Sequence, residues 1–577
     1  MRRILRLILI LAPLYGFAQT IDPTAYRYPI EGVLGLYAAN FGEVRPGHFH
    51  AGIDIKTELE EGKPLVAAMD GYISRVAIQA GGYGRALYLT LTNGTTAVYA
   101  HMQRFTEPIE AHIRSERYRR RTNAIDLYFT PDRFPVRQGE VIGYSGNSGS
   151  SSGPHLHYEI RNTADQSPRN LVRDGIIRPV DSLPPRFMKL HYIELDTLPN
   201  GIVQRRPMES YSVLCTAPGN YRLTHAEPLP VGRKGYFIAE VTDRRNGVQN
   251  TFAIYRLRGW LDGKAYFEFR MENFSYAISR TSDAVSHYPL QLDSRNEVLR
   301  LARLEGAPES FYPTLEERGL VRTEPGQRRT VELLIEDDCN NQSTLRFEVV
   351  GRTDSFTAEL PTDSLAVPLH RNRATTLRMG EFSAHIPAGA LYEGQYAKAE
   401  AGLVAPVDSG TVVLSPAYRI FDDPRVALFK PITITIHTHI PKELQGRTLL
   451  ALTNRKGRAA AAGGSYKDGE VSATTRSVGD WFVVADTLAP QITPLFTPTT
   501  PLDQNKRLTF RVADNFSGIA SWRLEIDGKW VPCDRYPSRG QLIWHIDEPA
   551  TGKQRCAVLT VRDAVGNEQR WEGKFTW

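Results

Sequence analysis

The chain has 577 residues, of which 41% are hydrophobic and 23% charged, and its formal net charge is +6 at pH 7. This length exceeds what one hydrophobic core accommodates, so several domains of about 100–200 residues are expected. The composition is that of a globular protein, which argues against long disordered tracts, and no segment is typical of a nucleic-acid-binding module. The small positive charge is compatible with weak attraction to an anionic polymer. It is equally compatible with a charged surface that only contacts solvent.

The N-terminus has the pattern of a secretory signal peptide. Arginines at positions 2, 3 and 6 flank the start of an apolar run over residues 5–14, and Gly16 and Ala18 supply the small side chains that signal peptidases prefer. The run is too short for a stable membrane anchor, and no later stretch has the length and apolar character of a transmembrane helix. We therefore predict a signal peptide over 1–18 and an exported chain, in the periplasm or at the cell surface.

The first predicted domain spans residues 19–184. Its segments 64–78 and 84–102 alternate apolar and polar residues and predict two hairpins, the second turning at Asn93-Gly94. Between residues 106 and 132 the pattern changes, because the first half is typical of a helix and is rich in arginine. The domain is therefore predicted to be a β-domain with one basic helical insert.

A proline-rich segment near Asp181 ends this domain, and β-type segments follow to the C-terminus. We predict further domains over 185–352, 353–485 and 486–577. The first and last of these share an order of strand, acidic turn, asparagine and strand, at 335–343 and 561–569, and both are predicted to be immunoglobulin-like β-sandwiches. The middle one is predicted to be a β-domain of uncertain type. The predicted fold class is mainly β, an antiparallel β-sheet domain followed by about three β-sandwich-type domains.

Two sets of residues in the later domains leave alternatives open. Asp514, Asp563 and Asn567 suit calcium binding, although such residues more often form turns in a sandwich. The cysteines show no CxxC or Cys/His spacing, so we expect no metal site there. In an exported chain Cys533 and Cys556 are one candidate disulfide and Cys215 with Cys339 a weaker one, with free thiols as the alternative.

The first domain contains residues with the chemistry of a metal site. In a strand, side chains at i and i+2 share a face, so His155 and His157 are expected side by side. His50 and Asp54 are also an even number of residues apart and can point the same way. Two imidazoles and one carboxylate leave an open position on zinc, which is typical of a catalytic site. Zinc in such a site lowers the pKa of its bound water toward ~7.

Three segments, FHAGIDI at 49–55, VYAHM at 98–102 and GPHLHYE at 153–159, resemble the motifs of the lysostaphin and LytM-type zinc peptidases. The resemblance covers about residues 42–161. It implies a small antiparallel β-sheet domain with its site in a groove, and one zinc ion per chain. Carried over position by position, the resemblance implies the metal ligands His50, Asp54 and His157 and the catalytic residues His101 and His155.

The implied activity is zinc-dependent hydrolysis of peptide cross-links in peptidoglycan, whose stem peptides are the expected substrate. One alternative is an inactive relative that binds cell wall and activates a partner hydrolase, but all five site positions are occupied here, which argues against it. Another is a secreted protease acting on glycine-rich proteins. For the later domains, spacing, wall attachment and docking of a protein partner are all open roles.

Two further sets of residues are candidates for substrate binding. The loop 146–153 consists of small residues apart from Asn147, which suits a groove wall that an extended peptide approaches closely. The basic insert departs from the family pattern, and it is expected either to bind substrate carboxylates or to be a solvated helix. Its candidate residues are Arg117, Arg119, Arg120 and Arg121.

A second HxH pair serves as an internal comparison. His437 and His439 have the spacing of His155 and His157, but no HxxxD segment accompanies them, so we expect surface residues on a strand. His48 is close to His50, yet only His50 has an aspartate four residues later. The sequence therefore favours one metal site, in the first domain.

Overall fold

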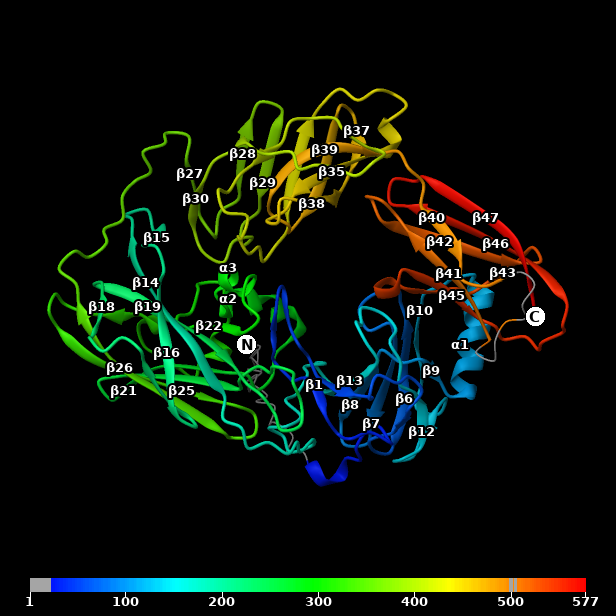
Figure 1. Ribbon diagram of the computed structural model, residues 1–577, viewed down its shortest axis with the longest axis horizontal. Coiled ribbons are helices and arrows are strands. Elements are labelled where there is room, and N and C mark those ends of the chain that lie inside the picture. The colour runs from blue at the N-terminus through cyan, green and yellow to red at the C-terminus, as the bar shows by residue number, and fades with distance from the viewer. Residues whose placement is uncertain (1–21, 498–501, 503–505) are drawn as a thin grey trace, which may run out of the picture.

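The structure is a computed structural model that describes residues 22–497, 502 and 506–577. The predicted signal peptide, residues 1–18, lies outside the described residues. The described chain is mainly β, as predicted. We refer to residues 22–184, 185–352, 353–485 and 486–577 as the first, second, third and fourth units. Figure 1 shows them following one another around a ring, so that the fourth unit lies beside the first.

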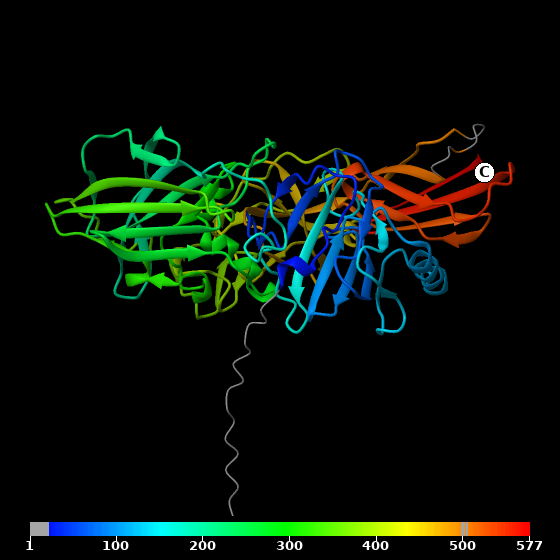
Figure 2. The same cartoon turned by 90° about the horizontal axis from the view of Figure 1, so that it is seen from below.

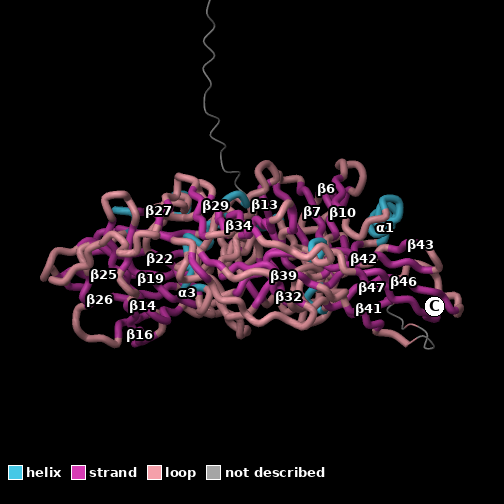
Figure 3. The backbone as a smooth tube through the Cα atoms, turned by 90° about the horizontal axis from the view of Figure 1, so that it is seen from above, coloured by secondary structure: helices cyan, strands magenta, loops and turns pink. Residues whose placement is uncertain are grey.

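The ring is flat when seen from its side (Figures 2 and 3). Four main hydrophobic cores follow one another along the chain. None of the helices that the structure describes has the length and apolar character to span a bilayer.

The first unit is built on an eight-stranded antiparallel sheet with a small second sheet beside it. In spatial order the large sheet contains β1 (Tyr37–Ala39), β4 (Ile53–Lys56), β13 (His155–Asn162), β8 (Thr95–Ala100), β7 (Arg85–Leu91), β6 (Gly71–Ile78) and β10 (Ile125–Tyr128), and β11 (Pro135–Val136) pairs with β6. The small sheet contains β5 (Pro64–Val66), β12 (Val141–Tyr144) and β9 (Arg104–Phe105). A short hairpin, β2 (Val44–Arg45) and β3 (His48–Phe49), lies apart from both sheets.

Of the two predicted hairpins, one is confirmed and one is wrong. β7 and β8 pair across Asn93-Gly94, and Gly94 has the positive φ of 79° that the turn requires. β5 and β6, however, belong to different sheets, because the turn between them carries the chain from one sheet to the other. The predicted helix in the basic insert is confirmed as α1 (Glu107–Arg120).

The second unit contains a 13-stranded mixed sheet rather than separate small sheets. Its main strands in spatial order are β22 (Glu297–Arg300), β19 (Lys234–Thr242), β14 (Arg186–Thr197), β16 (Glu209–Ala217), β17 (Asn220–Leu223), β26 (Gln342–Gly351), β25 (Arg328–Glu336), β20 (Arg256–Leu261), β21 (Lys264–Arg270) and β23 (Thr314–Leu315). A short helical segment, η2 (Tyr276–Thr281) and α2 (Ser282–Val285), faces the first unit (Figure 1).

The fourth unit contains two antiparallel sheets, and the third contains two larger antiparallel sheets and a two-stranded one, β27 (Val367–Leu369) with β30 (Gln395–Ala397). The strands of the larger sheets are as follows in spatial order. Those of the third are β28 (Thr375–Met379), β29 (Phe382–Ile386), β34 (Ile432–His437), β38 (Glu470–Thr475) and β37 (Ser465–Lys467), and β31 (Glu400–Ala401), β33 (Tyr418–Arg419), β39 (Asp480–Asp486), β35 (Thr448–Thr453) and β36 (Ala459–Gly463) with β32 (Thr411–Val413). Those of the fourth are β40 (Gln491–Pro494), β41 (Arg507–Ala513), β45 (Gln541–His545) and β44 (Asp534–Tyr536), and β43 (Lys529–Val531), β42 (Ile519–Ile526), β46 (Gln554–Asp563) and β47 (Glu568–Thr576).

All four cysteines are free, so neither candidate disulfide forms. Cys533 is fully buried in the core of the fourth unit, whereas Cys556 lies half-buried on β46. His437 and His439 are exposed at the end of β34, as predicted for surface residues.

The hairpin β2–β3 is packed into the second unit. Phe41 and Phe49 belong to the core of the second unit, and the ring of each packs against Phe274 with ring centroids 5.4–5.5 Å apart. The Phe49 amide donates to Ser279 Oγ (3.1 Å) and the Gly47 amide to Asp283 Oδ1 (2.7 Å). The second unit therefore fixes the segment that immediately precedes His50.

The fourth unit closes the ring on α1 and the edge of the first unit (Figure 1). The Asp534 carboxylate accepts hydrogen bonds from Arg85 Nη1 (2.8 Å) and from Arg117 Nη2 (2.5 Å). All three side chains are buried. Asn123 accepts from the Cys533 amide (2.9 Å). The contact is thus a buried ion-pair network joining residues more than four hundred positions apart in the sequence.

Candidate metal centre

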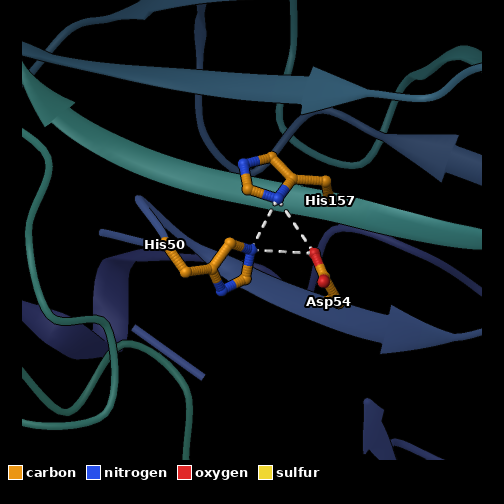
Figure 4. Close-up of side chains that lie close together, drawn as sticks. All are labelled: His50, Asp54 and His157. Carbon is orange, nitrogen blue, oxygen red and sulfur yellow. Dashed lines mark hydrogen bonds and ion pairs between the residues drawn. The ribbon is translucent and has the colours of Figure 1, made fainter. Parts of the chain in front are cut away.

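The structure brings His50, Asp54 and His157 together. His50 Nε2 lies 3.1 Å from Asp54 Oδ1 and 3.0 Å from His157 Nδ1, and the last two atoms are 2.9 Å apart. Figure 4 shows the three side chains converging from the chain after β3, from β4 and from β13. All three residues are buried, whereas His48 is exposed.

The local backbone explains this convergence. Asp54 and His157 are direct cross-strand partners in the antiparallel pair β4–β13, so their side chains leave the same face of the sheet. His50 is placed by its neighbours Phe49 and Ala51, which are both part of the second unit's core. Between His50 and Asp54 the chain runs against β13, and a Cβ on Gly52 would lie 2.3 Å from the Tyr158 carbonyl oxygen. Glycine is therefore required at position 52.

The three residues suit a zinc ion. Three ligand atoms about 3 Å apart can all be reached from one point at the usual zinc–ligand distance of about 2 Å. Two nitrogens and one carboxylate oxygen, without a thiolate, match the donor set of catalytic rather than structural zinc sites. The residues present therefore fit this metal.

Both candidate histidine ligands are oriented by a second contact. His50 Nδ1 donates to the Asn40 carbonyl oxygen (2.7 Å). His157 Nε2 lies 2.8 Å from Glu159 Oε1, two residues further along the same face of β13. Partners of this kind fix the orientation and tautomer of a metal-binding histidine. The remaining ring nitrogens, His50 Nε2 and His157 Nδ1, are thereby directed at the shared centre.

Glu159 is held by residues from two units. Arg161 Nε donates to Glu159 Oε2 (2.6 Å), as does the Tyr276 hydroxyl of the second unit (2.8 Å), while the Tyr83 hydroxyl donates to Oε1. Tyr83 also stacks on His157, with ring centroids 5.2 Å apart. The second unit thus completes the outer layer of the site.

The acidic residues of the site stay ionised despite burial. Burial alone would raise the pKa of Asp54, but His50 and His157 hold it well below its ordinary value. Glu159 behaves in the same way, since Arg161 and His157 outweigh burial and lower its pKa. For His157 burial favours the neutral form, but Asp54 and Glu159 overcome this and raise its pKa to about 9. The two carboxylates of the centre therefore stay ionised because neighbouring histidines and Arg161 offset the cost of their burial.

His101 and His155 lie beside the three candidate ligands. Their rings are 4.8 Å apart, and His155 Nε2 is 3.6 Å from Asp54 Oδ1. His101 Nδ1 donates to the Ser148 carbonyl (2.9 Å) and His155 Nδ1 to the Gly153 carbonyl (2.8 Å), so each neutral ring keeps Nε2 as a free acceptor. Burial, and then the neighbouring His155, lowers the pKa of His101 to about 3. His101 is therefore neutral at pH 7.

The backbone of His101 is unusual. Its φ is 60°, in the left-handed region that non-glycine residues rarely occupy. Such conformations cost roughly 1–3 kcal/mol and cluster at functional sites. The turn after β8 therefore holds His101 toward His155 at an energetic cost, which supports a functional role.

Asn147 is buried in the predicted loop and contacts the fourth unit. Its amide nitrogen donates to Ser151 Oγ (2.6 Å), and its oxygen accepts from Arg539 Nη2 (3.1 Å). Arg539 also pairs with Glu61 (2.5 Å). The turn η6 (Pro537–Arg539) thus lies against the loop that neighbours His101 and His155. Substrate binding by Asn147 stays a prediction.

The arginines of α1 fall into two groups. Arg117 is buried and paired with Asp534, so it holds the fourth unit in place rather than facing a substrate. Arg119 and Arg120 are exposed and pair with Glu116, and Arg121 is the exposed residue that directly follows the helix. The structure does not bring these three to the metal ligands, and their contact with an extended polymer stays a prediction.

Several residues of the site have no counterpart in the sequence analysis. Glu159 was detectable, because it continues the i, i+2 series of His155 and His157 on one face of a strand. Asn40, Tyr83 and Tyr276 gave no such signal, since long-range packing alone brings them to the ligands.

Comparison with known proteins supports a peptidase. Residues 132–170 match the model of peptidase family M23, and residues 366–486 match that of the Zu5-like domain. The DD-carboxypeptidase/endopeptidase Mpg of Neisseria meningitidis serogroup B is 35% identical over 112 residues, 19% of this chain and 20% of that protein. An uncharacterized metalloprotease of Haemophilus influenzae is 34% identical over 119 residues, 21% of this chain and 19% of that protein. The chain thus spans about a fifth of the length of these relatives.

Among solved structures, the catalytic domain of the prophage-encoded M23 protein EnpA from Enterococcus faecalis is similar to the chain at 27% identity. The match covers 23% of this chain and 85% of that chain, with a TM-score of 0.17. The predicted resemblance to lysostaphin and LytM-type peptidases is confirmed by the family match and the named relatives. The chain is an M23-like region followed by β-domains, the third unit being Zu5-like.

Proposed function

We propose that this chain is a zinc-dependent endopeptidase that hydrolyses peptide cross-links of peptidoglycan. The observation that most supports the proposal is the convergence of His50, Asp54 and His157 within 3.1 Å, with two further histidines beside them. A protein that only binds cell wall and activates a partner has no need for this set. The alternative of an inactive relative is therefore not favoured.

The side chains of the site have separate roles in this proposal. A zinc ion held by the three ligands would polarise the scissile carbonyl and activate a water molecule. His101 and His155 are neutral bases with Nε2 free, since Nδ1 of each is tied to a backbone carbonyl. They can accept the proton of the attacking water and pass it to the leaving amine. Glu159 and Asn40 keep the ligands in position throughout.

The remaining features support an extended substrate outside the cell. The loop 146–153 and η6 border the catalytic histidines on the side of the fourth unit, which suits a groove for a peptide stem. The predicted leader implies export to the periplasm or cell surface, where peptidoglycan lies. Immunoglobulin-like folds for the second and fourth units, and partner docking by the β-domains, are further proposals.

The test uses purified peptidoglycan with the zinc-loaded full chain and mass analysis of the fragments. We expect new termini from cleaved peptide bonds, with activity lost on chelation and in His157→Ala. His437→Ala, which alters the exposed second HxH pair, should retain activity. The masses also identify the bond, D-alanyl–diaminopimelate or interpeptide bridge. Equal digestion by the His157→Ala variant, or intact stems with the zinc-loaded parent, would contradict the proposal.

A further inference from the structure

Two groups of three aspartates occupy equivalent places in different units. Asp181 and Asp486 begin the similar segments DSLPPRF and DTLAPQI, which lead into the second and fourth units. Asp243 and Asp514 directly follow β19 and β41, at the end of a strand in each unit. A third aspartate follows or ends a later strand in each, Asp337 after β25 and Asp563 at the end of β46. We call these groups the first triad and the second triad.

In the first triad the carboxylates face one another, and three of their oxygens are buried without a hydrogen-bond partner among the described residues. Each of Asp181, Asp243 and Asp337 contributes an oxygen, and these oxygens all lie within 4.8 Å of one another. Asp243 is 0% exposed, and neither of its carboxylate oxygens has a hydrogen-bond partner among the described residues. Asp181 Oδ2 is also buried and without a partner there. Carboxylate oxygens of this kind are costly to bury unless a cation meets them.

The nearby arginine does not neutralise the triad. Arg245 directs Nη2 at both oxygens of Asp338, at 2.5 and 2.6 Å. No described lysine, arginine or histidine forms an ion pair with any of the three triad carboxylates. One guanidinium therefore faces four buried or half-buried carboxylates, which leaves a surplus of negative charge.

The second triad repeats this arrangement without any arginine. Asp486, Asp514 and Asp563 also have oxygens within 4.8 Å of one another. Asp514 Oδ1 is buried without a partner, as are the side-chain oxygens of Asn515 and Ser517 in the same loop. No ion pair to a triad member occurs among the described residues.

The two triads are also anchored alike. Asn341 donates its backbone N–H to Asp337 Oδ1 (2.9 Å) and its amide to Oδ2 (2.8 Å). Asn567 donates to Asp563 in the same way, at 2.8 and 2.7 Å. Two units with different sheets therefore present one repeated constellation of oxygen atoms.

We propose that each triad binds one calcium ion, so that the chain holds two in addition to the catalytic metal. The donors are all oxygens, which calcium and magnesium prefer and zinc does not. Calcium accepts several carboxylates in a flexible geometry, whereas magnesium demands a near-ideal octahedron and keeps much of its water. Each ion would tie the segment entering a unit to two of its loops and so stabilise that junction. The proposal does not depend on peptidase activity.

The experiment counts calcium on the full chain after treatment with a calcium chelator and dialysis into CaCl2. At about 5 mM calcium, sites with Kd of about 10⁻⁴–10⁻³ M are mostly filled. We expect two calcium ions per chain in the parent, one each in Asp243→Asn and Asp514→Asn, and none in the double variant. Asp422→Asn, which changes an exposed aspartate outside both triads, should keep two. Zinc is counted separately in the same samples.

A second measurement needs no variant. Ligands that bind only the folded state raise its stability, so calcium should raise the Tm of the parent by several degrees and equal magnesium should not. A parent that holds fewer than two calcium ions would overturn the duplicated site. So would a double variant that holds as much calcium as the parent, or a Tm that responds equally to both cations.

Discussion

The ion pairs of Asp534 close the ring between the fourth and first units, and their strength can be tested quantitatively. Asp534→Asn keeps the size of the side chain but removes the carboxylate that Arg85 and Arg117 share; Arg85 keeps its ion pair with Glu110, whereas Arg117 has no other ion-pair partner among the described residues. Removing one partner of a buried ion pair costs about 3–5 kcal/mol, because the other charge stays buried without compensation. We therefore expect the fourth unit to separate from the first far more often in this variant.

The pKa of Asp534 gives an independent estimate. Burial would raise it, but Arg117 and Arg85 lower it from 3.8 to about 2. This lowering of the pKa corresponds to roughly 2 kcal/mol of stabilisation. Because the folded pKa is the lower one, this contribution is present above about pH 4 and is lost as the pH falls toward 2. The contact should thus be stable at neutral pH and weaken in acid.

Native-state hydrogen exchange measures the opening directly. The Cys533 amide donates to Asn123 Oδ1 across the contact (2.9 Å), so its protection reports closure. Asp534→Asn should speed its exchange by about 30-fold or more, the equivalent of 2 kcal/mol or above. The matched control is Asp126→Asn, which breaks an exposed ion pair with Arg75 worth roughly 0–1 kcal/mol. Unchanged protection of the Cys533 amide in Asp534→Asn would show that this ion pair does not hold the fourth unit against the first.

Three predictions concern the metal centre. Asp54→Ala should lose most of its zinc by elemental analysis, and full occupancy would remove Asp54 from the ligand set. His101→Ala should keep zinc but hydrolyse peptidoglycan about 10²-fold more slowly or worse, as expected for a general base, so near-normal turnover would leave His101 a structural role. Tyr276→Phe removes the hydroxyl bonded to Glu159 and should weaken zinc binding about 10-fold in a chelator competition. Unaltered affinity there would show that the second unit does not support the site.

Sequence alone predicted that His50, Asp54 and His157 lie together, but not the packing around them. Alternation along a strand is local, so His155 and His157 could be placed on one face, and the spacing of His50 and Asp54 gave the other half. Pairing between distant strands is not local, and therefore the assignment of β5 and β6 to one hairpin failed. The 13-stranded sheet of the second unit and the closure of the ring also depend on contacts between residues that are far apart in the sequence. Alternation of apolar residues and turn motifs are local patterns, so they contain no information on such contacts.

These long-range contacts make the first unit dependent on the rest of the chain. Phe41 and Phe49 are buried only because Phe274 and its neighbours cover them, and His50 follows Phe49 directly. Without the second unit, these apolar rings would face water, and the hairpin that precedes the first ligand would lose its anchors. Glu159 would at the same time lose the Tyr276 hydroxyl. The metal centre is therefore a product of two units, although every one of its proposed ligands comes from the first.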